Sequence, residues 1–92
     1  KSKAEVMESV SPALPSLMRA QKLVKKSEIA NDFDEVFKNI QNAVDGLKDK
    51  NPDTISQILF ECARMGNIFD RDLEQDLFEK NDEFCKKTCK NV

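Results

Sequence analysis

The apolar residues of this chain recur at spacings of three and four, which is the repeat of an α-helix and not of a β-strand. The pattern is clearest over residues 28–47, where the apolar side chains fall on one side of a helix. These side chains are Ile29, Phe33, Val36, Phe37, Ile40, Ala43, Val44 and Leu47. Only two glycines and three prolines occur in 92 residues, so the chain lacks material for the many turns of a sheet protein. We therefore predict an all-α fold.

Residues that favour helix ends divide the chain into further elements. Ser27 is the expected N-cap of the helix over residues 28–47. The next helix is predicted over residues 52–65, because Pro52 suits a first helical position and Gly66 suits the position after a helix end. Two helices joined by so short a connection are expected to be antiparallel neighbours.

The two ends of the chain are predicted from similar signals. Asp70 is the expected N-cap of a last long helix, which Asn81 could interrupt to leave a separate short helix over residues 82–90. Pro15 marks the start of a helix in the first third, behind a short leading helix. The prediction is one domain over residues 1–92, a small antiparallel bundle of four main helices plus a short N-terminal helix.

The charge of the chain is nearly balanced but unevenly distributed. Fifteen basic and seventeen acidic residues give a net charge of −2, with an excess of basic residues in the first third and of acidic residues after it. The basic residues are not interleaved with aromatic ones, which argues against a nucleic-acid partner. The longest apolar run is three residues, so no membrane span is predicted.

The sequence contains no histidine, and it therefore lacks the usual general base and the commonest metal ligand. The alternating acids Asp70, Asp72, Glu74 and Asp76 are similar to the opening of a calcium-binding loop. Such a loop needs a glycine where Gln75 stands, so we predict no calcium site. The prediction is a protein that is not an enzyme, with no catalytic residues, no metal site and no cofactor.

Three cysteines, Cys62, Cys85 and Cys89, leave an odd thiol whichever pair is oxidised. In a straight helical hairpin Cys85 would lie roughly 22 Å along the axis from the connection, whereas a disulfide needs Cα atoms within about 7 Å. A candidate disulfide between Cys62 and either Cys85 or Cys89 therefore requires the chain to turn back near Asn81. The remaining thiol would be buried, reactive or bonded to another chain.

Two groups of apolar residues are candidates for binding. Phe60 follows Ile58 and Leu59 around its helix, so part of this run must point away from the core, and Phe60 is the candidate interaction surface. The interior of a helical bundle can also hold a small ligand between its helices. The candidate residues for such an apolar cavity are Phe33, Phe37, Phe69, Leu73 and Leu77.

These features predict a small secreted, non-enzymatic binding protein whose partner is another protein or a small, lipid-like apolar ligand. A homodimer is a further possibility of this class. The extracellular location is expected because the cysteines cluster and because the chain starts at Lys1 and not at Met. The alternative is an intracellular helical adaptor or interaction module, located in the cytoplasm, with reduced cysteines.

Overall fold

The computed structural model describes residues 2–90, and these residues form five helices and no strand. The helices are α1 (Lys3–Glu8), α2 (Ser16–Ser27), α3 (Phe33–Lys48), α4 (Asp53–Ile68) and α5 (Leu73–Lys90). The predicted all-α class, with four main helices and a short leading helix, is confirmed.

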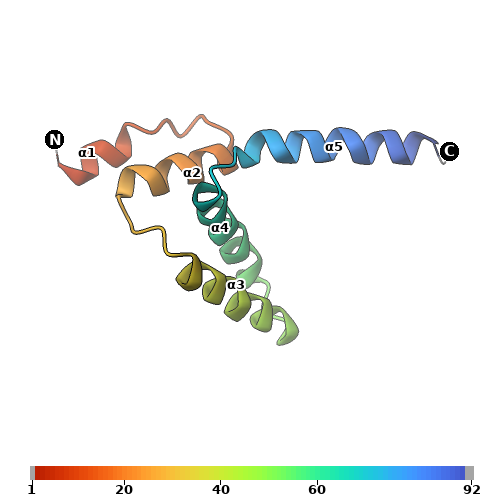
Figure 1. The fold of residues 1–92 in the computed structure, drawn as a ribbon, viewed down its shortest axis with the longest axis horizontal. Coiled ribbons are helices and arrows are strands. Elements are labelled where there is room, and N and C mark those ends of the chain that lie inside the picture. The colour runs from red at the N-terminus through yellow and green to blue at the C-terminus, as the bar shows by residue number, and fades with distance from the viewer. Residues whose placement is uncertain (1, 91–92) are drawn as a thin grey trace.

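Four of the helices pack together, whereas the fifth projects from them (Figure 1). Helices α3 and α4 form an antiparallel hairpin, α2 packs against α4, and α1 packs against α2. Helix α5 begins where α2 meets the end of α4 and then extends away, so an open angle separates it from the α3–α4 hairpin (Figure 1). We call this helix the α5 arm.

The buried apolar core of the described chain is small. Its members are Val10, Val24, Val36, Ala43 and Ala63. By contrast, many large apolar side chains are exposed, among them all six phenylalanines. The radius of gyration is 15.7 Å, whereas a compact domain of this length has a radius of about 12 Å. The chain is therefore more extended than a compact domain, because the α5 arm projects from the other four helices.

The helix predicted over residues 28–47 begins later than expected, at the start of α3. Glu28 has a left-handed φ of 59°, which ends α2. The Ser27 hydroxyl donates a hydrogen bond back to α2 over 2.6 Å and does not cap α3. Asp32 is the N-cap instead, because its carboxylate accepts the backbone N–H of Asp34 at 3.0 Å.

The start of α5 also differs from the prediction. Asp70 has a left-handed φ of 55° and lies in the connection after α4. The carboxylate of Asp72 accepts the backbone N–H of Gln75 at 3.2 Å, which is the geometry of an N-cap. The cap prediction therefore missed by two residues.

Helix α5 continues through Asn81 without a break. A separate short helix over residues 82–90 is therefore not present in this structure. Asn has only a modestly lower helix propensity than the residues around it, and a single such residue does not stop an otherwise favourable helix. Within residues 2–90, no helix has the length and apolar character that a membrane crossing requires.

Candidate functional site

A buried glutamine joins three helices at the base of the α5 arm. The Gln21 side-chain amide on α2 donates to the Asn67 side chain at 3.1 Å and to the Arg71 carbonyl at 2.8 Å. Its oxygen accepts the backbone N–H of Leu73 at 3.0 Å, which is the first residue of α5. Asn67 donates in return to the Gln21 carbonyl at 3.0 Å. One side chain therefore links α2, the end of α4 and the start of α5, and sets the direction of the arm.

The same joint needs a glycine in α4. A Cβ atom on Gly66 would lie 2.6 Å from Leu73 Cδ1 and 2.7 Å from Gln21 Nε2. The helix predicted over residues 52–65 does not end at Gly66, since α4 continues to Ile68. The role of Gly66 is to let α2 and α5 approach α4 closely.

An ion pair on the surface connects the residues before α5 to the first turn of the arm. The Arg71 guanidinium meets the Asp76 carboxylate with two hydrogen bonds, Nη2 to Oδ1 at 2.7 Å and Nε to Oδ2 at 3.1 Å. The hydrogen bond and the nearby negative charge of Asp76 raise the pKa of Arg71 above its ordinary value. Both partners are partly or fully solvated, so this contact directs the arm more than it stabilises the fold.

A concave, mostly apolar site lies where α2, α4 and α5 meet, and we call it the corner groove. It has a volume of about 480 Å³. Its walls are Pro15, Ser16, Leu17 and Ala20 from α2 and the residue before it, Ser56, Leu59 and Phe60 from α4, and Glu74 and Leu77 from α5. Phe60, the predicted interaction residue, lies here with 47% of its surface exposed.

The five residues predicted to line one cavity are divided between three places. Phe33 and Phe37 stack with ring centroids 5.8 Å apart, and Phe69 meets Phe33 edge to face at 6.1 Å. These three exposed rings form what we call the aromatic cluster. Leu73 and Phe69 border a shallower groove of about 260 Å³, and Leu77 lines the corner groove. The structure therefore does not enclose the five in a single cavity.

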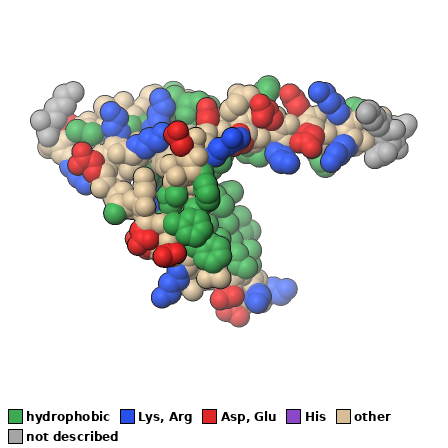
Figure 2. All heavy atoms as spheres, viewed as in Figure 1, with side chains coloured by type: hydrophobic (Ala, Val, Ile, Leu, Met, Phe, Trp, Pro, Cys, Tyr) green, Lys and Arg blue, Asp and Glu red, His purple; other side chains and the backbone are tan. Residues whose placement is uncertain are grey.

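Apolar side chains gather mainly on the α3–α4 hairpin, including the side that borders the open angle (Figure 2). In the same view, charged side chains are spread along α2 and the α5 arm. The exposed apolar surface is thus continuous enough to serve as a binding surface, since scattered single residues would not form such a patch.

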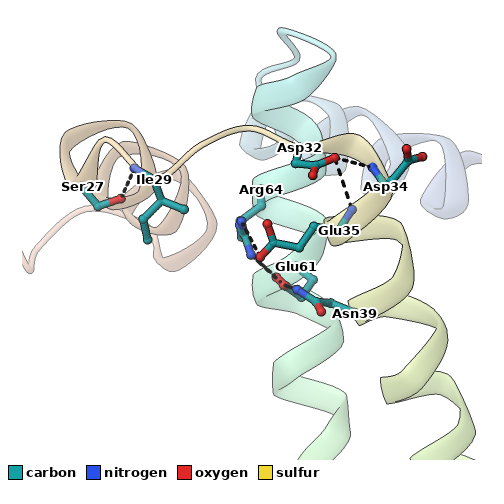
Figure 3. Close-up of polar contacts among 8 residues, drawn as sticks. All are labelled: Ser27, Ile29, Asp32, Asp34, Glu35, Asn39, Glu61 and Arg64. Carbon is teal, nitrogen blue, oxygen red and sulfur yellow. Dashed lines mark hydrogen bonds and ion pairs between the residues drawn. The ribbon is translucent and has the colours of Figure 1, made fainter.

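A buried ion pair within α4, on the side that faces α3, was not foreseen from the sequence (Figure 3). The Arg64 guanidinium contacts the Glu61 carboxylate at 3.0 and 3.3 Å, and both residues are more than 90% buried. Asn39 donates to Glu61 at 2.6 Å, and Glu35 lies 3.8 Å from Arg64. Among the described residues, Arg64 Nε and Nη2 have no hydrogen-bond partner. The sequence signal was an acid and a base three residues apart in the same helix.

The candidate disulfide is absent from this conformation, in which Cys62, Cys85 and Cys89 are all free. Cys62 borders the same groove as Leu73, at the base of the arm. Cys85 lies twelve residues further along a straight helix, which is roughly 18 Å. The turn at Asn81 that the candidate disulfide requires does not occur, so neither arm cysteine reaches Cys62 within one chain.

Comparisons of the chain with models of protein families, with curated proteins and with solved structures gave no match. No cluster of three or more potential metal-ligating side chains occurs within the described residues.

Proposed function

We propose that this protein acts by binding and not by catalysis, and that the corner groove takes an elongated, lipid-like apolar ligand. The observation that carries the proposal is the groove itself, in which six of nine wall residues are apolar and three helices contribute. Its volume of about 480 Å³ lies inside the range of roughly 300–1,000 Å³ that is typical of small-molecule sites.

The chemistry of the walls favours a particular kind of ligand. An alkyl chain would pack against Leu59, Phe60 and Leu77, which are half exposed without it. Glu74 is the one charged residue of the nine, and its carboxylate accepts the backbone N–H of Met18 at 3.4 Å. A carboxylate headgroup would be repelled there, so an alcohol or amide that donates a hydrogen bond is favoured over a fatty acid.

The test is a fluorescence titration of the full chain with a labelled long-chain alcohol and with the matching carboxylic acid. We expect the alcohol to bind more tightly than the acid. Phe60→Asp should weaken binding of the alcohol about 10-fold or more, because it removes a buried aromatic contact and adds a charge. Phe37→Asp is the matched control, since Phe37 is also 47% exposed but belongs to the aromatic cluster. Equal losses in both variants, or no binding of either probe, would contradict the proposal.

A protein partner on the aromatic cluster is the second candidate function. Exposed, mutually packed aromatic rings are the residues that most often dominate protein interfaces, and this cluster presents three of them. For this function Phe37→Asp becomes the test variant and Phe60→Asp becomes its control. Phe37→Asp would abolish association with a partner identified in native material, and Phe60→Asp would leave it unchanged.

The extracellular location stays a prediction in this proposal, with the cytoplasmic adaptor as its alternative. A thiol count on native protein distinguishes the two, because a secreted protein would have at least one cysteine pair oxidised. Three free thiols in native material would favour the intracellular alternative.

A further inference from the structure

The α5 arm is an amphipathic helix whose apolar side lacks a covering element within the described chain. Leu77, Phe78 and Phe84 are 48%, 58% and 70% exposed, and Phe84 is the most exposed large apolar residue of the structure. Helical spacing places these three on one side together with Asn81 and Cys85. We call these five residues the arm face. Leu77 also lines the corner groove, so this end of the arm face lies where the open angle between α5 and the α3–α4 hairpin begins (Figure 1).

We propose that the arm face binds the arm face of a second copy of this chain, with the two α5 helices antiparallel about a twofold axis at Asn81. The order of the residues supports this register. Leu77 and Cys85 each lie four residues from Asn81, and Phe78 and Phe84 each lie three residues from it. An antiparallel pair centred there sets apolar residues against apolar residues on both sides of the Asn81 pair.

The charges of the arm select the antiparallel orientation. Residues 70–83 carry seven acids against two basic residues, whereas Lys86 and Lys87 follow near the tip. In an antiparallel pair the base of each arm, which carries Asp70, Asp72, Glu74 and Asp76, lies beside the tip of the second copy, which carries Lys86 and Lys87. A parallel pair would set acids against acids and lysines against lysines.

The exposed surface of the chain is larger than that of a compact protein of its size. A compact monomer of 10.5 kDa exposes about 5,400 Å², so the 7076 Å² of this chain is an excess of about 1,700 Å². The uncovered arm contributes to this excess, and a second copy on the arm face would cover part of it.

Asn81 has a specific role in this pairing. At the twofold axis it meets the second copy's Asn81, and two amide side chains can donate to and accept from each other. A polar residue at one core position of a helix pair fixes the register at some cost in stability. The residue that first suggested a helix break is thus assigned as the residue that aligns the two arms.

The pairing does not depend on the ligand proposed for the corner groove, and either proposal can fail alone. The two are neighbours in space, because the second copy's Phe84 comes to lie beside Leu77 at the edge of the groove. The dimer would therefore narrow the open side of the corner groove.

The first experiment is a crosslink at the axis. In the full chain with Cys62, Cys85 and Cys89 replaced by serine, Asn81→Cys should form a disulfide-linked dimer of twice 10.5 kDa under mild oxidation. Glu79→Cys in the same background is the matched control, since Glu79 is also exposed but lies on the opposite side of α5. We expect at least 10-fold more crosslinking at position 81. Equal crosslinking at both positions, or none at position 81, would overturn the proposal.

The second experiment measures the mass of the unmodified protein in solution by light scattering. We expect a dimer that Phe84→Glu converts to a monomer with unchanged helix content by circular dichroism. Val44→Glu is the control, because Val44 is exposed on α3 and distant from α5 in sequence, and this variant should stay dimeric. A wild-type monomer at high micromolar concentration overturns the pairing, whether the arm then folds onto its own chain or binds a different protein. A Phe84→Glu variant that remains dimeric also overturns it.

Discussion

The α3–α4 hairpin and the α5 arm are built from helices of similar length and similar amphipathic character, yet only the hairpin buries some of its apolar side chains, while it leaves others, such as Phe37 and Leu59, exposed. Helices α3 and α4 have 16 residues each and α5 has 18. The hairpin buries Val36, Ala43 and Ala63, whereas the arm leaves Phe78 and Phe84 exposed. A short connection returns α4 along α3, but the joint at Gln21 directs α5 away. The direction in which a helix leaves its neighbour, and not its amphipathic pattern alone, decides what it buries.

The charged residues of the two regions differ in the same way. The Glu61–Arg64 pair of the hairpin is buried between helices, where removal of one partner leaves an uncompensated charge. On the arm, Glu83 lies 3.7 Å from Lys80 and 3.9 Å from Lys87, and all three are exposed to water. Such surface ion pairs contribute little to the free energy of unfolding. The same residue types therefore contribute very differently to the stability of the fold in the hairpin and in the arm.

The largest effect is expected from breaking the buried pair of the hairpin. Arg64→Ala should lower the free energy of unfolding by about 3–5 kcal/mol, because Glu61 would stay buried without its counter-charge. Urea denaturation at a fixed protein concentration measures this change. The arm supplies the control, Lys80→Ala, for which we expect a change of about 0.5 kcal/mol or less. If the two variants lose similar stability, the contrast between hairpin and arm is wrong.

The next effect is expected at the joint between the two regions. Gly66→Ala should cost about 1–3 kcal/mol, because the new methyl group would overlap Leu73 and Gln21. It should also speed amide hydrogen exchange in the first turn of α5, since the start of the arm must move. Gln57→Ala, at an exposed position of the same helix, should change neither quantity. A stable Gly66→Ala protein with an unchanged arm would show that the joint is not tightly packed.

A similar or somewhat smaller loss of stability is expected when Gln21, the glutamine that holds the arm, is replaced. Gln21→Ala should lower stability by about 1–3 kcal/mol, because the Leu73 N–H and the Arg71 carbonyl lose their partner. Gln41→Ala on the exposed side of α3 is the matched control and should be neutral. Small-angle scattering would detect a change of arm direction as a shift from the radius of gyration of 15.7 Å. If both variants showed identical scattering and identical stability, Gln21 would not be the residue that holds the arm in its direction.

The smallest effect is expected from the ion pair at the base of the arm. Asp76→Asn should change the free energy of unfolding by about 1 kcal/mol at most, because the Arg71–Asp76 contact is solvated. Denaturation in low and high salt should show that this difference shrinks as salt screens the charges. A loss that persists unchanged in high salt would indicate that the contact acts by packing and not by charge.

The helices were predictable because their signals are local. Val36 and Ala43 lie on the stripe that predicted α3, and both are buried. Phe60 was expected to point away from the core, and it lies half exposed in the corner groove. The caps were predictable only within a few residues, because several neighbouring acids and hydroxyl residues could have served, as with Asp70 and Asp72.

The arrangement of the surfaces was not predictable from local patterns. Gln21 meets Leu73 across 52 positions of sequence, and nothing in the spacing of either residue indicates that contact. The break considered at Asn81 does not occur, for a related reason. A turn there would have been required by a disulfide within one chain, whereas the helix itself has no reason to stop.

By itself, the sequence determined the all-α class, the number of main helices and the side of each helix that is apolar, because these depend on periodicity over a few turns. Only the tertiary structure decided which apolar sides are covered. Contacts between distant residues set the angle between α4 and α5, and that angle leaves the arm face and the corner groove open. The binding surfaces of this protein are therefore a consequence of one joint, which is made of a glutamine, a glycine and the first residue of the arm.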